Sequence, residues 1–161
     1  MTCTDNHRTI ADALTSMLLP TRTYLHHYDE TSDRRLIIAD LPLDGALIVM
    51  ETTTASCQER ARTRLLAELL PRLQHEQHVR HVVLESRSGS DKHDRRTLNK
   101  LRQSRVVSTD LRMDHARKNE SALVWLPDFV AGAYFAAEYH GQPEPWGLIS
   151  AAHAVDVHTF S

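Results

Sequence analysis

The chain has 161 residues, of which 41% are hydrophobic and 25% are charged, and its net charge is −2. These values are typical of one soluble globular domain, and they exclude a disordered chain, a collagen-like chain and a coiled coil. No apolar stretch is long enough to cross a bilayer, and the N-terminus lacks the pattern of a secretory signal. The two cysteines, Cys3 and Cys57, do not make a disulfide framework, so we expect a cytoplasmic protein without membrane association.

The first third of the chain contains patterns for two helices and two strands. Periodicity predicts them in the order helix 6–19, strand 22–28, helix 31–40 and strand 46–50. Pro20 ends the first helix. The first strand would place Tyr24, His26 and Tyr28 on one face, because side chains alternate along a strand.

The remaining elements continue this alternation. A capping-box pattern at Ser56 to Glu59 opens a long helix, which Pro71 should kink or shorten. Further patterns predict a strand at 80–85, a polar loop at 86–90, a basic helix at 91–104, a strand at 111–115, an apolar helix within 121–138, a loop at Pro143 and Pro145, and a helix and a strand within 147–160. Alternating strands and helices predict a single α/β domain over residues 1–161 with at least partly parallel strands.

Charge is unevenly distributed along these elements. Residues 80–118 contain eleven Arg and Lys against five Asp and Glu, a net charge of +6, which leaves −8 on the rest of the chain. A basic segment of this kind suggests an anionic partner, with nucleic acid as the first candidate. The alternative is a solvated helix face rich in Arg. The segment contains no aromatic residue, so it offers no platform on which single-stranded bases could stack.

Asp128 is the most informative carboxylate. It is the only charged residue between Ser121 and Ala137. A segment that is apolar on nearly all sides is typically buried, where a lone carboxylate is costly unless it is paired or binds a metal ion. Alternatively, Pro127 at the first helical position would place Asp128 in the first turn, where the helix dipole favours an anion.

Other carboxylates follow the ends of predicted strands. Glu85 ends one strand, and ligand sites in open α/β sheets lie at the carboxyl ends of strands. Asp91 and Asp94 begin the basic helix, and Glu30 follows the first predicted strand. Each also fits an ordinary strand end or helix start. If several converge, their oxygen atoms suit Mg²⁺ or Mn²⁺, ions that support phosphodiester cleavage.

The sequence contains 11 histidines. His26 lies near Glu30 on the face of the two tyrosines, where it could orient a ligand or relay a proton near pH 7. A zinc site is disfavoured, because the series from His75 to His81 crosses from a helix into a strand and the cysteines lack zinc-ligand spacing.

Three segments occur in a fixed order: LPTRTYLHHYDETSDRR at 19–35, VVLESR at 82–87 followed by Asp91 and DRR at 94–96, and LPDFVAGA at 126–133. Together they resemble a large group of bacterial domains of unknown function that have a ribonuclease-H-like fold. The resemblance covers about residues 8–157. It implies a shortened ribonuclease-H-like mixed sheet flanked by helices.

In ribonuclease-H-like enzymes, carboxylates on a central strand and nearby helices bind two divalent metal ions. The resemblance implies that Glu85 and Asp128 are metal ligands, with Glu30 and Asp94 at the positions between them. It also implies that His26 corresponds to a frequent histidine on the preceding strand.

The family's domains open with a strand bearing Asp-Glu-Ser and a second apolar strand, and this sequence contains neither. We therefore expect the first metal ligand and one edge of the sheet to be missing. Three interpretations stay open: a truncated product, a non-catalytic member, or a half-site that a partner completes.

The leading hypothesis is a metal-dependent nuclease-like domain that acts on nucleic-acid phosphodiesters with Mg²⁺ or Mn²⁺. Glu85 and Asp128 would bind the metal ion, aided by Glu30 or Asp94. Three arginines would hold phosphate: Arg87, Arg95 and Arg96. The second hypothesis is a non-catalytic binding or assembly module, because an exposed sheet edge invites pairing with another chain, including a second copy. Small-molecule or zinc binding through the histidines ranks third.

Overall fold

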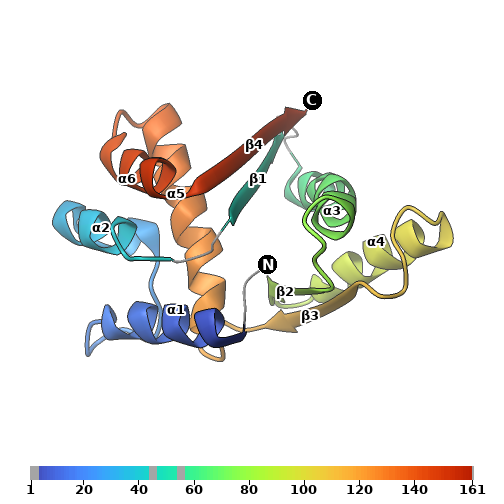
Figure 1. Cartoon of the computed structure of the whole chain (residues 1–161), viewed down its shortest axis with the longest axis horizontal. Coiled ribbons are helices and arrows are strands. Elements are labelled where there is room, and N and C mark those ends of the chain that lie inside the picture. The colour runs from blue at the N-terminus through green and yellow to red at the C-terminus, as the bar shows by residue number, and fades with distance from the viewer. Residues whose placement is uncertain (1–3, 44–46, 54–56, 161) are drawn as a thin grey trace. The chain divides into compact units, whose positions relative to one another are not determined.

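The computed structural model describes residues 4–43, 47–53 and 57–160. The chain divides into two compact units, both drawn in Figure 1. The first, which we call the sheet unit, consists of Val49–Ala116 and Val157–Ser161; the second, the helical unit, consists of Thr2–Ile48 and Arg117–Asp156. The predicted mixture of helices and strands is confirmed, so the chain is an α/β protein.

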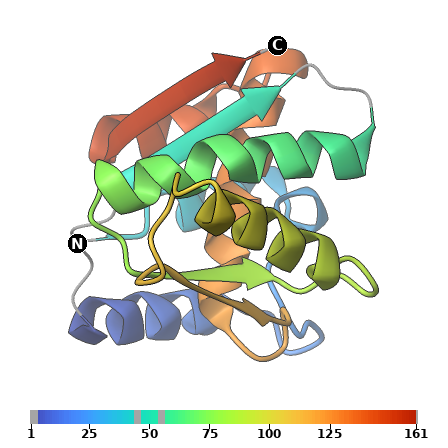
Figure 2. The same ribbon diagram turned by 90° about the vertical axis from the view of Figure 1, so that its right-hand side faces the viewer.

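Within residues 57–116, the sheet unit contains two parallel strands and two helices. Its elements are α3 (Gln58–His75), β2 (His81–Glu85), α4 (Asp91–Gln103) and β3 (Arg112–Ala116). The strands are in register from His81 opposite Arg112 to Glu85 opposite Ala116, and their arrows run the same way in Figure 2. Parallel strands need a long crossover connection, which α4 provides.

One face of the β2–β3 sheet carries the apolar core of the sheet unit. Val82 and Leu84 share this face because side chains alternate along a strand, whereas Val83 on the opposite face is 46% exposed. The register places Met113 beside Val82 and His115 beside Leu84, and therefore on the core face. The surrounding core residues are Leu66, Leu70, Leu98, Leu101, Val107 and Leu111.

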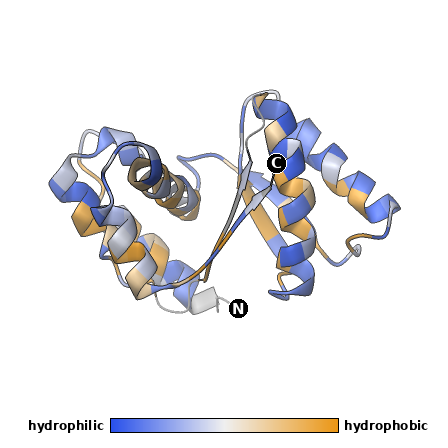
Figure 3. Ribbon diagram, turned by 90° about the horizontal axis from the view of Figure 1, so that it is seen from above, coloured by the Kyte–Doolittle hydropathy of each residue, from blue (hydrophilic) through white to orange (hydrophobic). Residues whose placement is uncertain are grey.

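The helical unit consists mainly of short helices. They are α1 (Thr4–Ser16), η1 (His27–Asp29), α2 (Ser32–Ala39), η2 (Ala122–Val124), α5 (Trp125–Tyr139) and α6 (Glu144–Ala152). Hydrophobic residues recur between hydrophilic ones along the helices in Figure 3. The buried side chains of this unit include Ile10, Leu14, Leu25, Ile38, Trp125, Phe129, Val130, Ala133 and Ile149.

A second two-stranded sheet joins β1 (Leu47–Thr53) to β4 (Ala154–Phe160). The Thr52 and Thr159 hydroxyls lie 2.7 Å apart, which adds a side-chain hydrogen bond between these strands. The chain passes from one unit to the other within both strands.

Most of the predicted elements are confirmed, with ends shifted by a few residues. Four details differ. α3 continues past Pro71 to His75, so Pro71 does not end it. α5 already begins at Trp125, two residues before Pro127. Pro145 lies in the first turn of α6 rather than in a loop, at a position that tolerates proline. Ser56 of the predicted capping box lies outside the described residues, and the N-cap Cys57 makes no side-chain capping bond.

The predicted strand at 22–28 is wrong. The alternation of its side chains is real, since Leu25 and His27 are buried while Tyr24 and Tyr28 are exposed. However, the segment pairs with no strand in the part of the chain that the structure describes, and it tightens into the 3-10 helix η1 at His27. Burial of Leu25 and His27, with His27 packed against Phe129 and Gly132 of α5, produces the same alternation as a strand face.

Gly132 permits the close approach of α5 to the buried His27. A Cβ atom at position 132 would lie 2.6 Å from the Cβ of His27, which is too short for an ordinary contact. We expect Gly132→Ala to lower the free energy of unfolding by about 2 kcal/mol, because overpacking outweighs the better helix propensity of Ala. Urea denaturation measures this change.

The matched control is Gly147→Ala in α6, where an added Cβ meets nothing within 4 Å. This variant should be neutral or slightly more stable than the unaltered chain. Equal stability of the two variants would contradict the close contact at Gly132.

Candidate functional site

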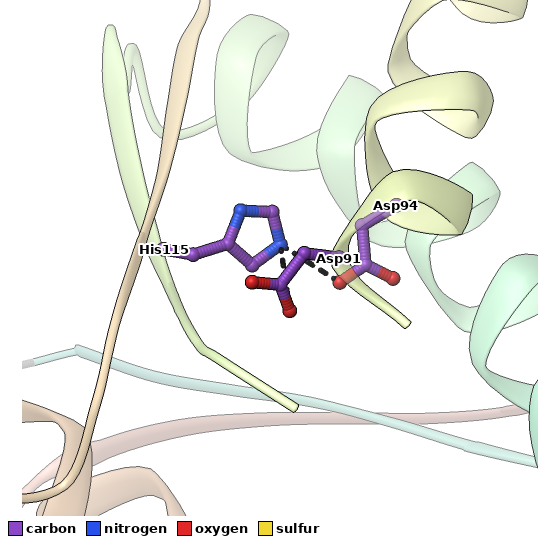
Figure 4. A group of neighbouring side chains, drawn as sticks. All are labelled: Asp91, Asp94 and His115. Carbon is purple, nitrogen blue, oxygen red and sulfur yellow. Dashed lines mark hydrogen bonds and ion pairs between the residues drawn. The ribbon is translucent and has the colours of Figure 1, made fainter. Parts of the chain in front are cut away.

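Two carboxylates and a histidine lie together at the carboxyl end of the β2–β3 sheet. Asp91 and Asp94 occupy the first turn of α4, and His115 comes from β3, as Figure 4 shows. One potential ligand atom from each residue lies within 4.8 Å of the other two. His115 Nε2 is 3.0 Å from Asp94 Oδ2 and 3.9 Å from Asp91 Oδ1. We call these three residues the acid–histidine group.

The secondary structure explains this convergence. His115 shares the core face with Met113, so its ring points toward the helices that cover that face. Asp91 and Asp94 are three residues apart and therefore lie on the same side of α4. The short loop after β2 keeps the start of α4 close to the strand ends.

Asp94 is the most enclosed member of the group, with 2% of its surface exposed. Arg62 of α3 donates from Nε to Oδ1 and from Nη2 to Oδ2, both at 2.9 Å. A two-point pair of this kind is strong and fixes the geometry of both groups. Burial raises the pKa of Asp94, but hydrogen bonds from Arg62 and His115 outweigh it, so the pKa lies below its ordinary value.

Asp91 is held by the loop that precedes α4. The Ser86 hydroxyl donates to Oδ2 at 2.7 Å, and the backbone N–H of Arg87 donates to Oδ1 at 2.9 Å. These two hydrogen bonds lower the pKa of Asp91. Both carboxyls of the acid–histidine group are therefore ionised at neutral pH.

His115 faces these carboxylates with Nε2. Its side chain is 4% exposed, and its Nδ1 is buried without a hydrogen-bond partner among the described residues. Nε2 therefore carries the polar contacts that orient the ring. A histidine that binds a metal ion usually donates its other N–H to an acceptor, and the described residues supply no such acceptor to His115.

The donor set can hold a divalent cation. Two carboxylates and one imidazole supply oxygen and nitrogen ligands, and their negative charge is only partly balanced by Arg62. An ion at Asp94 would compete with Arg62 for the same two oxygens. The local electrostatics therefore favour cation binding at Asp91 and His115 and oppose it at Asp94.

The three arginines predicted to hold phosphate differ in their surroundings. Arg95 and Arg96 are exposed on α4, close to the acid–histidine group in the sequence. The Arg87 side chain instead contacts Glu59, with Nη2 3.0 Å from Oε1, and the Ser90 hydroxyl lies 3.2 Å from the same oxygen. Arg95 and Arg96 are thus the more accessible cations.

Glu85 and Asp128, the two predicted metal ligands, belong to different units. Glu85 ends β2 in the sheet unit, and strand alternation directs it away from the core face that His115 shares. Asp128 lies in the helical unit. Their joint binding of one ion stays a prediction, whereas Asp94 is the predicted site residue that does belong to the acid–histidine group.

Asp128 is not the buried lone charge that its apolar neighbours suggested. It lies in the first turn of α5, as the alternative predicted, although α5 begins at Trp125 and not at Pro127, and its side chain is 27% exposed. His26 Nδ1 makes a short hydrogen bond to its Oδ2, and Lys118 Nζ is 3.7 Å from the same atom. The structure therefore brings together two of the predicted site residues, His26 and Asp128.

Glu30 has a structural partner in the helical unit. Its side chain is buried, and Arg34 Nε lies 2.5 Å from Oε2. Arg34 also donates to the carbonyl of Met17, so this ion pair ties the start of α2 to the chain after α1. The buried pair accounts for Glu30 without a metal ion.

Two residues of the site, His115 and Arg62, were not predicted from the sequence. The signal for His115 was present, because Met113 and His115 are two residues apart in a predicted strand and therefore share its apolar face. The signal for Arg62 was absent, because α3 contains several arginines at similar spacing and only the packing of α3 on α4 selects one of them.

Comparison with known protein-family models, curated proteins and solved structures finds no match for this chain. None of the described helices has both the length and the apolar character needed to cross a membrane.

Proposed function

We propose that this chain is a divalent-metal-dependent, nuclease-like domain that acts on nucleic-acid phosphodiesters. The observation that carries the proposal is the acid–histidine group, whose three ligand atoms lie within 4.8 Å of one another at the carboxyl end of a parallel sheet. This is the edge at which open α/β sheets bind ligands. The basic helix α4, which supplies both carboxylates, supports an anionic substrate.

The donor set favours Mn²⁺ over Mg²⁺. Mg²⁺ prefers oxygen ligands alone, whereas Mn²⁺ accepts carboxylate together with imidazole. When bound, the ion would supply a Lewis acid that lowers the pKa of a water molecule and stabilises charge on the phosphate. Asp91 and His115 would hold the ion. Asp94 would add a ligand oxygen once the Arg62 side chain pairs with another anion.

The substrate phosphate would be held by exposed arginines of α4. Arg95 and Arg96 are exposed and follow Asp94 directly in the sequence. In this proposal, an arginine–phosphate contact positions the backbone without reading the base sequence. Arg87 would take part after releasing Glu59.

The same proposal includes a ribonuclease-H-like fold and metal binding by Glu85 and Asp128. Support comes from the parallel β2–β3 pair with its α4 crossover, and from the position of Asp128 in the first turn of a late helix. In this proposal the acid–histidine group is the stronger cation site, because its three ligand atoms lie within 4.8 Å of one another.

Incubation of labelled DNA and RNA with Mn²⁺ tests the proposed activity. We expect cleavage that EDTA abolishes and that Asp91→Asn reduces at least tenfold, because the variant removes a negative ligand. Asp114→Asn is the matched control, since Asp114 is exposed on β3 and pairs with His81 outside the group. Absence of cleavage, or equal cleavage by both variants, would overturn the proposal.

A second candidate function is a non-catalytic assembly module. It is favoured by the sheets, because β2 pairs only with β3 and β1 only with β4 in the described part of the chain. Each sheet therefore has edges that could add a strand of another copy. Light scattering of the purified chain tests this candidate: a stable dimer supports it, and a monomer at all concentrations excludes self-assembly.

A further inference from the structure

Five side chains of the helical unit form a continuous row. Lys118 Nζ lies 5.0 Å from the centre of the Tyr24 ring and 3.7 Å from Asp128 Oδ2. Asp128 in turn contacts His26, whose ring centre is 5.9 Å from that of Tyr28. We call Tyr24, Lys118, Asp128, His26 and Tyr28 the tyrosine row.

Both tyrosines of the row are exposed, and both are held by neighbours. Tyr24 is 38% exposed and Tyr28 is 49% exposed. Tyr28 packs edge-on against the buried His27, with ring centres 5.1 Å apart, and Arg35 lies 5.9 Å from its ring centre. Rings that are fixed in this way lose little conformational entropy when a ligand stacks on them.

Cations accompany the exposed rings. Lys118 lies over Tyr24, Arg35 lies over Tyr28, and Arg22 is 3.4 Å from Asp29 at the surface. Asp128 offsets Lys118, and Asp29 offsets Arg22. The Arg35 guanidinium contacts neutral acceptors, among them the carbonyl oxygens of His27 and Tyr28. Aromatic faces beside such cations match a ligand with flat rings and phosphates.

Lys118 links this row to the basic sequence segment. It is the last basic residue of segment 80–118, which contains no aromatic residue of its own. Within the helical unit, Lys118 itself lies over the Tyr24 ring, which gives this one cation an aromatic platform. A ligand that combines stacking with backbone charge is recognised by such a platform.

We propose that the tyrosine row binds single-stranded nucleic acid, with bases stacked on Tyr24 and Tyr28 and phosphate near Lys118. The inference deepens the proposed function, on which it rests for the substrate class, by naming the single-stranded form. A duplex hides the faces of its bases, so it cannot stack on both rings without opening. The His26–Asp128 hydrogen bond holds the centre of the row, and Asp128 in turn holds Lys118 near Tyr24.

Fluorescence anisotropy with labelled oligo-dT in EDTA tests this binding without any cleavage. We expect Tyr24→Ala and Tyr28→Ala each to weaken binding by about 5- to 100-fold, because loss of one stacked base has an effect of this size. Tyr→Phe variants should retain binding, since the ring face is kept. Lys118→Ala should weaken binding and reduce the slope of log affinity against log salt by about one.

Tyr139→Ala is the matched control, because Tyr139 is 69% exposed on α5 and lies outside the row. It should leave the affinity unchanged. No binding of oligo-dT, equal loss in the Tyr139 variant, or tighter binding of duplex DNA would overturn the proposal. Binding that persists while the Mn²⁺ cleavage assay fails would retain this inference and remove only the proposed catalysis.

Discussion

Asp94→Ala is expected to lower the free energy of unfolding by about 3 kcal/mol. The substitution leaves Arg62 and His115 without the carboxylate that both contact, and breaking a buried ion pair by removing one partner is strongly destabilising. Removing one partner of a buried ion pair costs about 3 to 5 kcal/mol, and the Arg62 side chain is 26% exposed, so we expect a loss near the lower value. Urea denaturation followed by circular dichroism measures it.

The matched control is Asp114→Ala. Asp114 lies on β3 next to His115, but its pair with His81 is exposed, so its loss should change the free energy of unfolding by less than about 1 kcal/mol. If Asp94→Ala costs no more than the control, then the contacts of Asp94 with Arg62 and His115 do not stabilise the sheet unit, and the buried position of Asp94 is contradicted.

The protein should lose about 2 kcal/mol of stability between pH 7.5 and pH 5 because of His27. Burial, followed by the nearby charge of Arg35, lowers the pKa of His27 from 6.5 to about 4. The unfolded chain therefore binds more protons than the folded chain between these values, so stability falls as the pH falls through this window. The full effect, reached below pH 4, is about 3 kcal/mol.

Unfolding in urea at a series of pH values measures this dependence. His27→Leu should flatten the curve between pH 4 and 6.5, because the ring that resists protonation is gone. The ring nitrogens of His27 have no partners among the described residues, so the variant should keep its stability near pH 7.5. An unchanged pH dependence in His27→Leu would contradict the assignment to this residue.

Elements with strong periodicity could be predicted from the sequence, and the irregular segment 22–28 could not. Val82 and Leu84 indicated the apolar face of β2, and the apolar spacing in α1 indicated that helix. Alternation at 22–28 reflects the burial of Leu25 and His27, the latter against α5, rather than pairing with a strand. Sequence alone does not distinguish these two causes, because both place every second side chain inward.

The candidate site was only partly predictable. Asp94 was singled out, and Asp91 was recognised as a helix-start acid, since both begin α4. His115 comes from a strand 21 residues later, and its approach to Asp94 depends on the parallel register of β2 and β3. Register is a tertiary property, so the convergence follows only when the two strands are paired.

The charge pattern indicated a nucleic-acid partner, but the basic segment 80–118 contains no aromatic residue on which bases could stack. In the folded chain, Lys118 at the end of that segment lies against Tyr24, which is distant in sequence. Asp128 is a lone carboxylate in an apolar run of the sequence, but in the folded chain it contacts His26 and Lys118. Residues adjacent in space but not in sequence therefore carry the functional proposals.

The most direct test of the metal site is Mn²⁺ binding measured by electron paramagnetic resonance on the full chain. We predict saturable binding of one ion per chain, at least tenfold weaker in Asp91→Asn and in His115→Gln, and unchanged in Asp114→Asn. Binding that all three variants share, or no saturable binding by the unaltered chain, would contradict the assignment of the acid–histidine group as a cation site.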